Sequence, residues 1–195
     1  MGVETVTLFL AMLAVVALVG SAALVVSFLT GDRFGLWAAV RPLSTEFAAA
    51  VAVTATAGSL YLSEGAQYTP CRLCWIQRGF MYPAAVLLVA AVVTRRAWLR
   101  LTAAGLAAVG LLVAAFHRYE QEFGGVGDFC QADNPCSLRW VNEFGFMTIP
   151  TMAGIGFVAI LTLVVLRELD ERRSRQPAPM PAVAESERVP VSDRS

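Results

Sequence analysis

The sequence predicts an all-α integral membrane protein: a four-helix transmembrane bundle core plus one extra N-terminal transmembrane helix. Of the 195 residues, 57% are hydrophobic and 15% are charged, whereas a soluble domain carries roughly 25% charged residues. The apolar residues also form long runs without any charge. Fifteen acidic residues balance fifteen arginines, so the net charge gives no reason to expect nucleic acid as a partner. These observations exclude a soluble globular protein.

Five runs approach the roughly 20 apolar residues that a helix needs to cross a lipid bilayer. The first run is longer than the apolar core of a signal peptide and follows a segment without basic residues, so we expect a retained helix. The third run reaches full length if its first turns extend back to Cys74. The five runs are residues 6–29, 47–62, 79–94, 101–116 and 144–166.

The chain divides accordingly into three parts. Residues 1–46 hold the first helix and a cytoplasmic connection, and residues 47–166 hold the four-helix core with two external cysteine-bearing segments. Residues 167–195 are rich in arginine, proline and serine, and we expect a disordered cytoplasmic tail. In the second run, Ala50, Thr54 and Gly58 recur at every fourth position, which suggests a close contact between helices.

The arginines predict the orientation, because cytoplasmic connections carry the excess of basic residues. Five spans place nine arginines near the helix ends on one side and four on the other. We therefore expect the N-terminus outside and the C-terminus inside a bacterial cell membrane. The nine are Arg33, Arg41, Arg95, Arg96, Arg100, Arg167, Arg172, Arg173 and Arg175, and the four are Arg72, Arg78, Arg118 and Arg139.

All four cysteines fall on the outer side of this topology. Cys71 and Cys74 lie in the segment YTPCRLCWIQR, and Cys130 and Cys136 lie in CQADNPC within an external loop. Because the space outside the bacterial cytoplasm is oxidising, we expect disulfides. Two pairs allow three connectivities, and the short spacings suggest 71–74 and 130–136 as one resting state.

Three roles for the cysteines remain open. Structural disulfides stabilise mainly by closing long loops, which a C-x-x-C pair does not do. Four thiolates could hold zinc, although the second spacing is longer than in usual zinc knuckles. A tight C-x-x-C pair suits reversible thiol–disulfide exchange. The chain is therefore either a thiol oxidoreductase or a non-enzymatic multi-span membrane protein with structural loop disulfides or a four-cysteine metal site.

Helical spacing favours the redox role. At about 100° per residue, Cys71, Cys74 and Arg78 share one helix face, at roughly 0°, 300° and 340°. A helix N-terminus and an arginine both favour a thiolate, here at Cys74. Arg78 could donate to a reducible lipid-soluble ring or could be a snorkelling border residue. His117 ends the fourth run on the same side, either as a polar terminus or as a donor to that ring.

The external loop contains two further features. Asp133, Asn134 and Pro135 favour a turn that brings Cys130 and Cys136 together. Beyond this turn, a helix would place three apolar side chains on one face, and that stretch could lie on the membrane surface and tether the loop. Ordinary entry into the last span explains the same pattern. The three residues are Trp140, Val141 and Phe144.

These motifs together resemble the disulfide bond formation protein B (DsbB) family, and more closely its BdbC-type branch. The resemblance rests on CRLCWIQR followed by an apolar helix, on the external two-cysteine loop and on CSLRWVNEFGFMTIP, and it covers roughly residues 47–166. It implies a quinone-dependent oxidase of protein dithiols. Such a protein reoxidises an extracytoplasmic, DsbA-like oxidase of thioredoxin fold and passes the electrons to ubiquinone or menaquinone in the membrane.

The resemblance also implies roles for individual residues. Cys130 would form the mixed disulfide with the partner, and Cys136 would pass electrons to Cys71. Cys74 would face the quinone and form its adduct. The short spacing between Cys130 and Cys136 leaves open which of the two is attacked first.

Two further residues gain roles from the resemblance. Arg78 would stabilise charge at the quinone, and His117 matches a histidine near the quinone ring. No resident metal is implied. The first helix is additional to the four-helix core, and its role stays open.

Overall fold

The computed structural model describes residues 2–124, 130 and 135–175. Within them, five helices are long and apolar enough to cross a membrane, which confirms the predicted fold class of a multi-pass, all-α membrane protein. The second candidate span joins several consecutive helical segments. In chain order the elements are α1 (Val3–Leu29), α2 (Leu36–Val40), the 3₁₀ turn η1 (Arg41–Leu43), α3 (Ser44–Leu60), the π-helical turn η2 (Tyr61–Gly65), α4 (Arg72–Thr94), α5 (Ala97–Phe123) and α6 (Ile149–Arg175).

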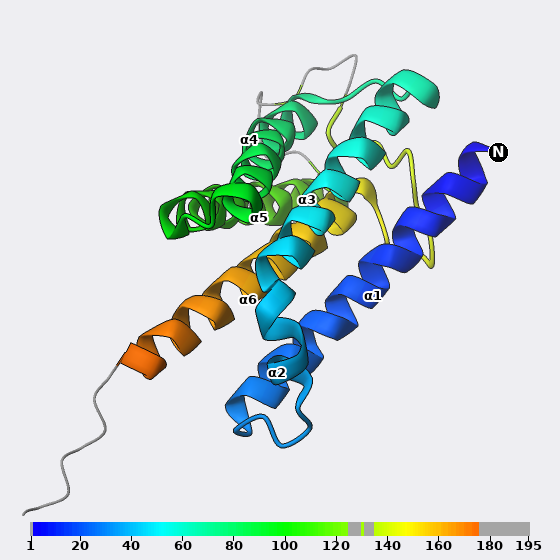
Figure 1. The fold of residues 1–195 in the computed structure, drawn as a ribbon. Helices are drawn as coiled ribbons and strands as arrows, with labels where there is room; N and C mark the ends of the chain where they lie inside the picture. The colour runs from blue at the N-terminus through cyan, green and yellow to red at the C-terminus, as the bar shows by residue number, and fades with distance from the viewer. Residues whose placement is uncertain (1, 125–129, 131–134, 176–195) are drawn as a thin grey trace, which may run out of the picture.

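Helices α3 to α6 form the bundle, and α1 runs along one side of it (Figure 1). Small side chains dominate the contacts between these helices. In lipid the hydrophobic effect does not drive apolar helices together, so they associate through the close packing that small residues allow. Larger side chains of α6, including Phe157 and Ile160, fill the remaining space. The small buried residues are Ala48, Ala49, Ala52, Ala84, Ala85, Ala103, Ala104, Ala107 and Ala114.

Helix α1 is attached to α6 and to the loop that precedes it. Ala11 and Ala14 of α1 pack against Ile155 of α6. Near the start of α1, the Thr7 hydroxyl donates to the Glu143 carboxylate at 3.0 Å. The first helix is therefore part of the folded unit.

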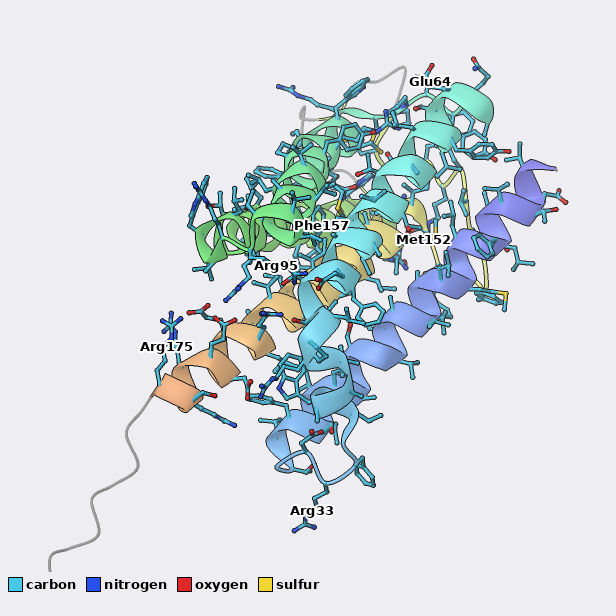
Figure 2. All side chains as sticks on the ribbon, viewed as in Figure 1. Arg33, Glu64, Arg95, Met152, Phe157 and Arg175 are labelled. Carbon is cyan, nitrogen blue, oxygen red and sulfur yellow. A yellow bond between two sulfur atoms is a disulfide. The ribbon has the colours of Figure 1, made fainter. Side chains whose placement is uncertain are left out.

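The two ends of the bundle differ in charge. Glu64 lies at the end that also holds the N-terminus, whereas Arg33 and Arg175 lie at the opposite end (Figure 2). At that opposite end the buried Arg100 pairs with Glu168 and Glu171 of α6. The structure thus places Arg33, Arg100 and Arg175, which the sequence assigns to one side, at one end.

The last helix begins at Ile149, so the prediction of a helix from residue 144 is wrong at its start. Phe144 and Gly145 have positive φ angles of 54° and 77°. The backbones of Glu143 and Met147 exchange two hydrogen bonds, of 3.0 and 2.8 Å. This tight turn replaces the first predicted helical residues.

The helical face predicted for Trp140, Val141 and Phe144 is also wrong, because these residues lie in non-helical chain. Val141 is buried, and Trp140 stacks on Tyr68 with ring centroids 5.2 Å apart. Packing against the cysteine-bearing end of the bundle therefore holds this segment. The turn predicted at residues 133–135 falls partly outside the described residues.

Helix α6 continues to Arg175 and includes residues 167–175, which the sequence assigns to the tail. Ion pairs at i,i+4 spacing explain the extension, because they stabilise exposed helical turns. They join Arg167 to Glu171 and Arg172 to Glu168. The remainder of the predicted tail, residues 176–195, lies outside the described residues.

Candidate active site

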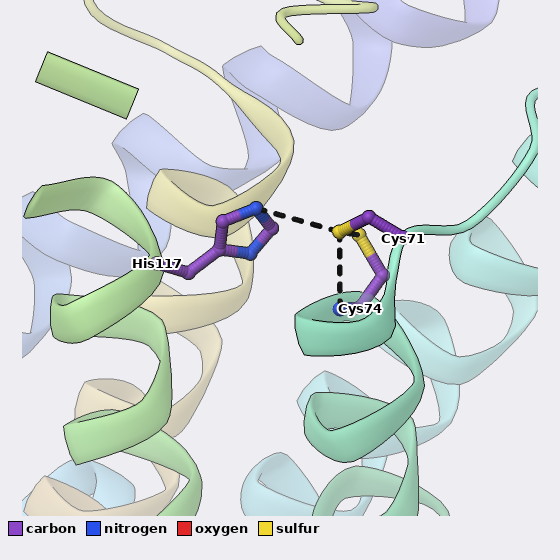
Figure 3. A group of neighbouring side chains, drawn as sticks. All are labelled: Cys71, Cys74 and His117. Atoms are coloured by element: carbon purple, nitrogen blue, oxygen red, sulfur yellow. Dashed lines mark hydrogen bonds between the residues drawn. The ribbon is translucent and has the colours of Figure 1, made fainter. Parts of the chain in front are cut away.

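Cys71 and Cys74 lie at the N-terminus of α4 (Figure 3). Cys71 has extended backbone and caps the helix: its Sγ accepts a hydrogen bond from the backbone N–H of Cys74 at 3.4 Å. The two Sγ atoms lie 2.9 Å apart as an unbonded, hydrogen-bonded pair of thiols. The disulfide suggested for this pair is therefore not formed in this structure, which holds the pair in its reduced state.

His117 reaches the same sulfur from α5. Its Nε2 lies 3.6 Å from the Cys71 Sγ and 3.2 Å from the backbone oxygen of Cys136. On the other side of the ring, Nδ1 lies 3.4 Å from the side-chain nitrogen of Gln77. An amide nitrogen can only donate, so Nδ1 accepts and Nε2 carries the hydrogen. The ring is thus oriented to donate towards Cys71 and Cys136.

These contacts favour a thiolate at Cys71. The hydrogen bond from the Cys74 thiol lowers the pKa of Cys71 from 9.0 to about 4, with further lowering by His117 and by the Cys74 backbone N–H. Burial acts in the opposite direction. The sequence favoured Cys74 as the thiolate, but the N-terminal N–H of the helix points at the capping sulfur, which belongs to Cys71.

Cys130 and Cys136 form a disulfide, as their spacing suggests. It packs in one cluster with Cys71, Cys74 and Leu73, so the structure brings all four cysteines together. Cys136 is 2% exposed, whereas Cys130 is less buried. Cys130 is therefore the more accessible sulfur of the disulfide.

Arg78 and Cys74 both line an apolar cleft between α1, α3, α4 and α6, with a volume of about 400 Å³. The Arg78 guanidinium also reaches α3, where Nε donates to the Ser59 Oγ at 2.9 Å and Nη2 to the Ser59 backbone oxygen at 2.8 Å. These bonds hold the cation beside the cleft. Small-molecule sites commonly have volumes of roughly 300–1,000 Å³ and apolar walls with a few polar groups.

The structure thus places every predicted site residue at one end of the bundle, in two adjoining groups. Cys71, His117 and Cys136 form the buried group, with Cys130 partly exposed beside them, and Arg78 stands with Cys74 on the cleft. Sequence reasoning missed Gln77 and Ser59. Gln77 was detectable, because on the same helical wheel it lies about 60° from Cys74.

Among the described residues, one group could hold a metal, and it joins two of the four cysteines predicted as ligands with His117. The ligand atoms of Cys71, Cys74 and His117 lie within 4.8 Å of one another. A four-cysteine site does not fit this structure, because Cys130 and Cys136 are bonded to each other.

Comparison with known proteins agrees with this geometry. Residues 43–167 match the family model described as "Disulfide bond formation protein DsbB". A "Probable disulfide formation protein" of Oceanobacillus iheyensis is 41% identical over 122 residues, which cover 60% of this chain and 84% of that protein. "Disulfide bond formation protein C" of Bacillus subtilis is 36% identical over 118 residues, covering 60% and 86%.

A third relative, "Probable disulfide formation protein C 1" of Bacillus anthracis, is 38% identical over 118 residues, covering 58% of this chain and 84% of that protein. No solved structure matches the chain. The family match begins at residue 43, so α1 lies entirely before the matched region.

Proposed function

Because the chain belongs to the disulfide bond formation protein DsbB family, we propose that it is a membrane thiol:quinone oxidoreductase. It reoxidises a thioredoxin-fold dithiol oxidase outside the cytoplasm and passes the electrons to a membrane quinone. The single observation that carries this proposal is the contiguity of the site. The four cysteines form one cluster, and one of them, Cys74, also lines a cleft with apolar walls.

The first step takes electrons from the partner. A thiolate of the partner attacks Cys130, the more accessible sulfur of the disulfide, and Cys136 leaves as a thiolate. The partner's second thiolate then attacks its own sulfur in the mixed disulfide and releases Cys130, so that the partner leaves with a disulfide. Two electrons have now moved to Cys130 and Cys136, which are both reduced.

The second step moves the electrons inward. With Cys71 and Cys74 joined as a disulfide, Cys136 attacks Cys71, its neighbour in the buried cluster, and Cys74 leaves as a thiolate. Cys130 then attacks the bridge between Cys136 and Cys71, which restores the outer disulfide and leaves Cys71 as a thiolate. The structure corresponds to this state: the outer disulfide is formed and the inner pair is reduced.

The third step removes the two electrons from Cys71 and Cys74. A bound quinone supplies a two-electron, two-proton acceptor, and it fits the cleft because the walls are apolar while a thiol and a guanidinium lie at one place on them. The negative charge rests on Cys71, and the shared proton stays on Cys74, the sulfur that faces the cleft. Re-forming the Cys71–Cys74 disulfide would give a quinone in the cleft two electrons and this proton, with the second proton taken from water. Arg78 stabilises negative charge in the cleft.

The arginine distribution supports an orientation. The end of the bundle that gathers nine arginines faces the cytoplasm, according to the positive-inside rule. The N-terminus and the cysteines then lie outside, where a bacterial cell maintains oxidising conditions.

A reconstitution experiment tests the function. The purified protein should oxidise a reduced thioredoxin-fold dithiol protein over many turnovers only when ubiquinone or menaquinone is added, with one quinone reduced for each disulfide formed in turnover. Thiol alkylation tests the non-enzymatic alternative. Cysteines in structural disulfides stay unreactive when the reduced partner is added, whereas the cysteines of a redox relay become reactive in pairs. Repeated turnover without quinone, or no turnover with either quinone, would refute the proposal.

A further inference from the structure

We infer that α1 is a substrate-binding helix, and that the cleft between α1 and α3 takes the isoprenoid tail of the quinone whose ring meets Cys74 and Arg78. This inference rests on the proposed function and extends it, because α1 lies outside the region that matches the family. The inference gives a role to α1, the helix that is additional to the four-helix core.

The first observation is that α1 contributes a continuous stripe to the cleft. Leu10, Leu13, Ala14 and Ala17 line it at the spacing i, i+3, i+4 and i+7, which defines one helix face. A neighbouring part of the same helix packs on α6 through Ala11 and Ala14. Helix α1 is thus fixed on α6 while it presents an apolar face to the cleft.

The second observation concerns the opposite wall, formed by α3. Ala50 and Thr54 line the cleft and are exposed, although their spacing suggests a close helix contact. At Gly58 the helices meet closely, because an added Cβ would lie 3.0 Å from the side chain of Leu10. The small residues of α3 therefore leave a hollow beside α1 along part of the helix.

The third observation is continuity with the redox site. The same cleft that α1 and α3 line is also lined by Cys74 and Arg78. Along α3 and η2 the lining runs from Phe47 to Ser63, a distance of roughly 24 Å at 1.5 Å per residue. A ring held at Cys74 and Arg78 would thus have a long apolar channel for its tail. An isoprenoid chain is the tail that membrane quinones carry.

The test compares quinones with and without an isoprenoid tail in the intact protein. Ala17→Leu on α1 and Thr54→Leu on α3 each fill the cleft away from Cys74 and Arg78. Each should raise the KM for the tailed quinone about tenfold or more and leave the KM and kcat for the tail-less quinone unchanged. Ala22→Leu is the matched control, because Ala22 is exposed on the same helix and does not line the cleft. It should change neither KM.

Several results would overturn the inference. One is an equal KM for the tailed quinone in Ala17→Leu, Ala22→Leu and the unmodified protein. Another is an equal rise in KM for both quinones, which would mean that α1 acts on the ring site or on the fold. Unchanged turnover with the tail-less quinone shows that a variant is folded.

A binding experiment that needs no turnover separates this inference from the proposed function. A photoreactive isoprenoid quinone should label α1 near Leu13, and Ala17→Leu should reduce the labelling. A photoreactive phospholipid is the parallel probe: labelling by the phospholipid alone would make the cleft a lipid site and refute the inference. Labelling by the quinone in a protein that reduces no quinone would support the tail site and refute only the proposed function.

Discussion

Arg78 of α4 is bound to Ser59 of α3 by two hydrogen bonds, from Nε to the hydroxyl at 2.9 Å and from Nη2 to the backbone oxygen at 2.8 Å. This double contact fixes the guanidinium at the wall of the cleft that Cys74 also lines. A border arginine that only snorkels to the lipid headgroups would need no such partner. The contact therefore favours a role at the proposed quinone site.

Arg78→Ala should raise the KM for quinone by roughly 10- to 100-fold, because hydrogen bonds to charged groups contribute about 1.5–3 kcal/mol. The KM for the dithiol partner should stay unchanged, since the proposed attack of the partner is on Cys130. Steady-state kinetics with each substrate varied in turn measures both. Equal effects on the two KM values would mean that Arg78 is only a border residue.

Two further variants sharpen this test. Arg78→Lys keeps the charge but loses the planar set of donors, so its KM for quinone should lie between those of the unmodified protein and Arg78→Ala. Ser59→Ala leaves the bond to the backbone oxygen in place and should have a smaller effect than Arg78→Ala.

Cys74→Ser should abolish quinone reduction and leave the outer disulfide able to react. Cys74 is the cysteine that lines the cleft, whereas Cys130 and Cys136 are bonded to each other at the other side of the cluster. Stopped-flow absorbance with added quinone measures the first effect. The reactivity of the outer disulfide is measured by the yield of mixed disulfide with a partner that lacks its second cysteine.

Cys130→Ser is the complementary variant. It should trap no partner, but its inner pair, once reduced chemically, should still reduce quinone. Normal turnover in Cys74→Ser, or trapping of the partner through Cys136 in Cys130→Ser, would contradict the proposed order of electron transfer.

Much of the fold followed from the sequence, because membrane spans depend on local hydropathy. The five spans needed no knowledge of packing. The start of the last helix did not follow, because residue 144 has an apolar side chain that also suits a helix. What ends the helical pattern there is the positive φ of Phe144 and Gly145 together with the backbone pairing of Glu143 and Met147.

The site was predictable where its residues share one helix and unpredictable where they come from several. Cys74 and Arg78 lie one turn apart on α4 and both line the cleft, as helical periodicity predicted, whereas Cys71 caps the helix with extended backbone. The contact between Arg78 and Ser59 joins residues 19 positions apart, and that between Gln77 and His117 joins residues 40 apart. Such contacts depend on how the helices pack, and so does the cleft beside α1.

Reduced Cys71 should be alkylated as a thiolate down to acidic pH. An acid whose pKa is lowered keeps its charge as pH falls until that pKa is reached, so the alkylation rate should decline with a midpoint near pH 4 rather than near 9.0. Cys74→Ala removes the bond that lowers the pKa most and should move the midpoint towards 9.0. A pH profile of iodoacetamide labelling, with Cys130 and Cys136 protected by their disulfide, measures this.

His117→Leu should raise the pKa of Cys71 as well, because His117 supplies the next stabilising contact after Cys74. Gln77→Leu should act in the same direction by a smaller amount, since Gln77 only orients the ring. Gln77→Glu is a useful comparison, because a carboxylate would accept from Nδ1 and reverse the orientation of the donor. An unchanged midpoint in His117→Leu would exclude the imidazole as a source of the low pKa.

Gly110→Ala should destabilise the bundle, and Gly105→Ala in the same helix should not. A Cβ added at Gly110 would lie closer than 3.0 Å to three atoms of the Phe157 ring, whereas one added at Gly105 meets nothing within 4 Å. Overpacking of this kind costs about 1–3 kcal/mol, while alanine is favoured over glycine in a helix by roughly 1 kcal/mol. Thermal unfolding in detergent should therefore show a lower Tm for Gly110→Ala and an equal or higher Tm for Gly105→Ala. Equal Tm values for the two variants would mean that α5 and α6 do not approach closely at Gly110 and Phe157.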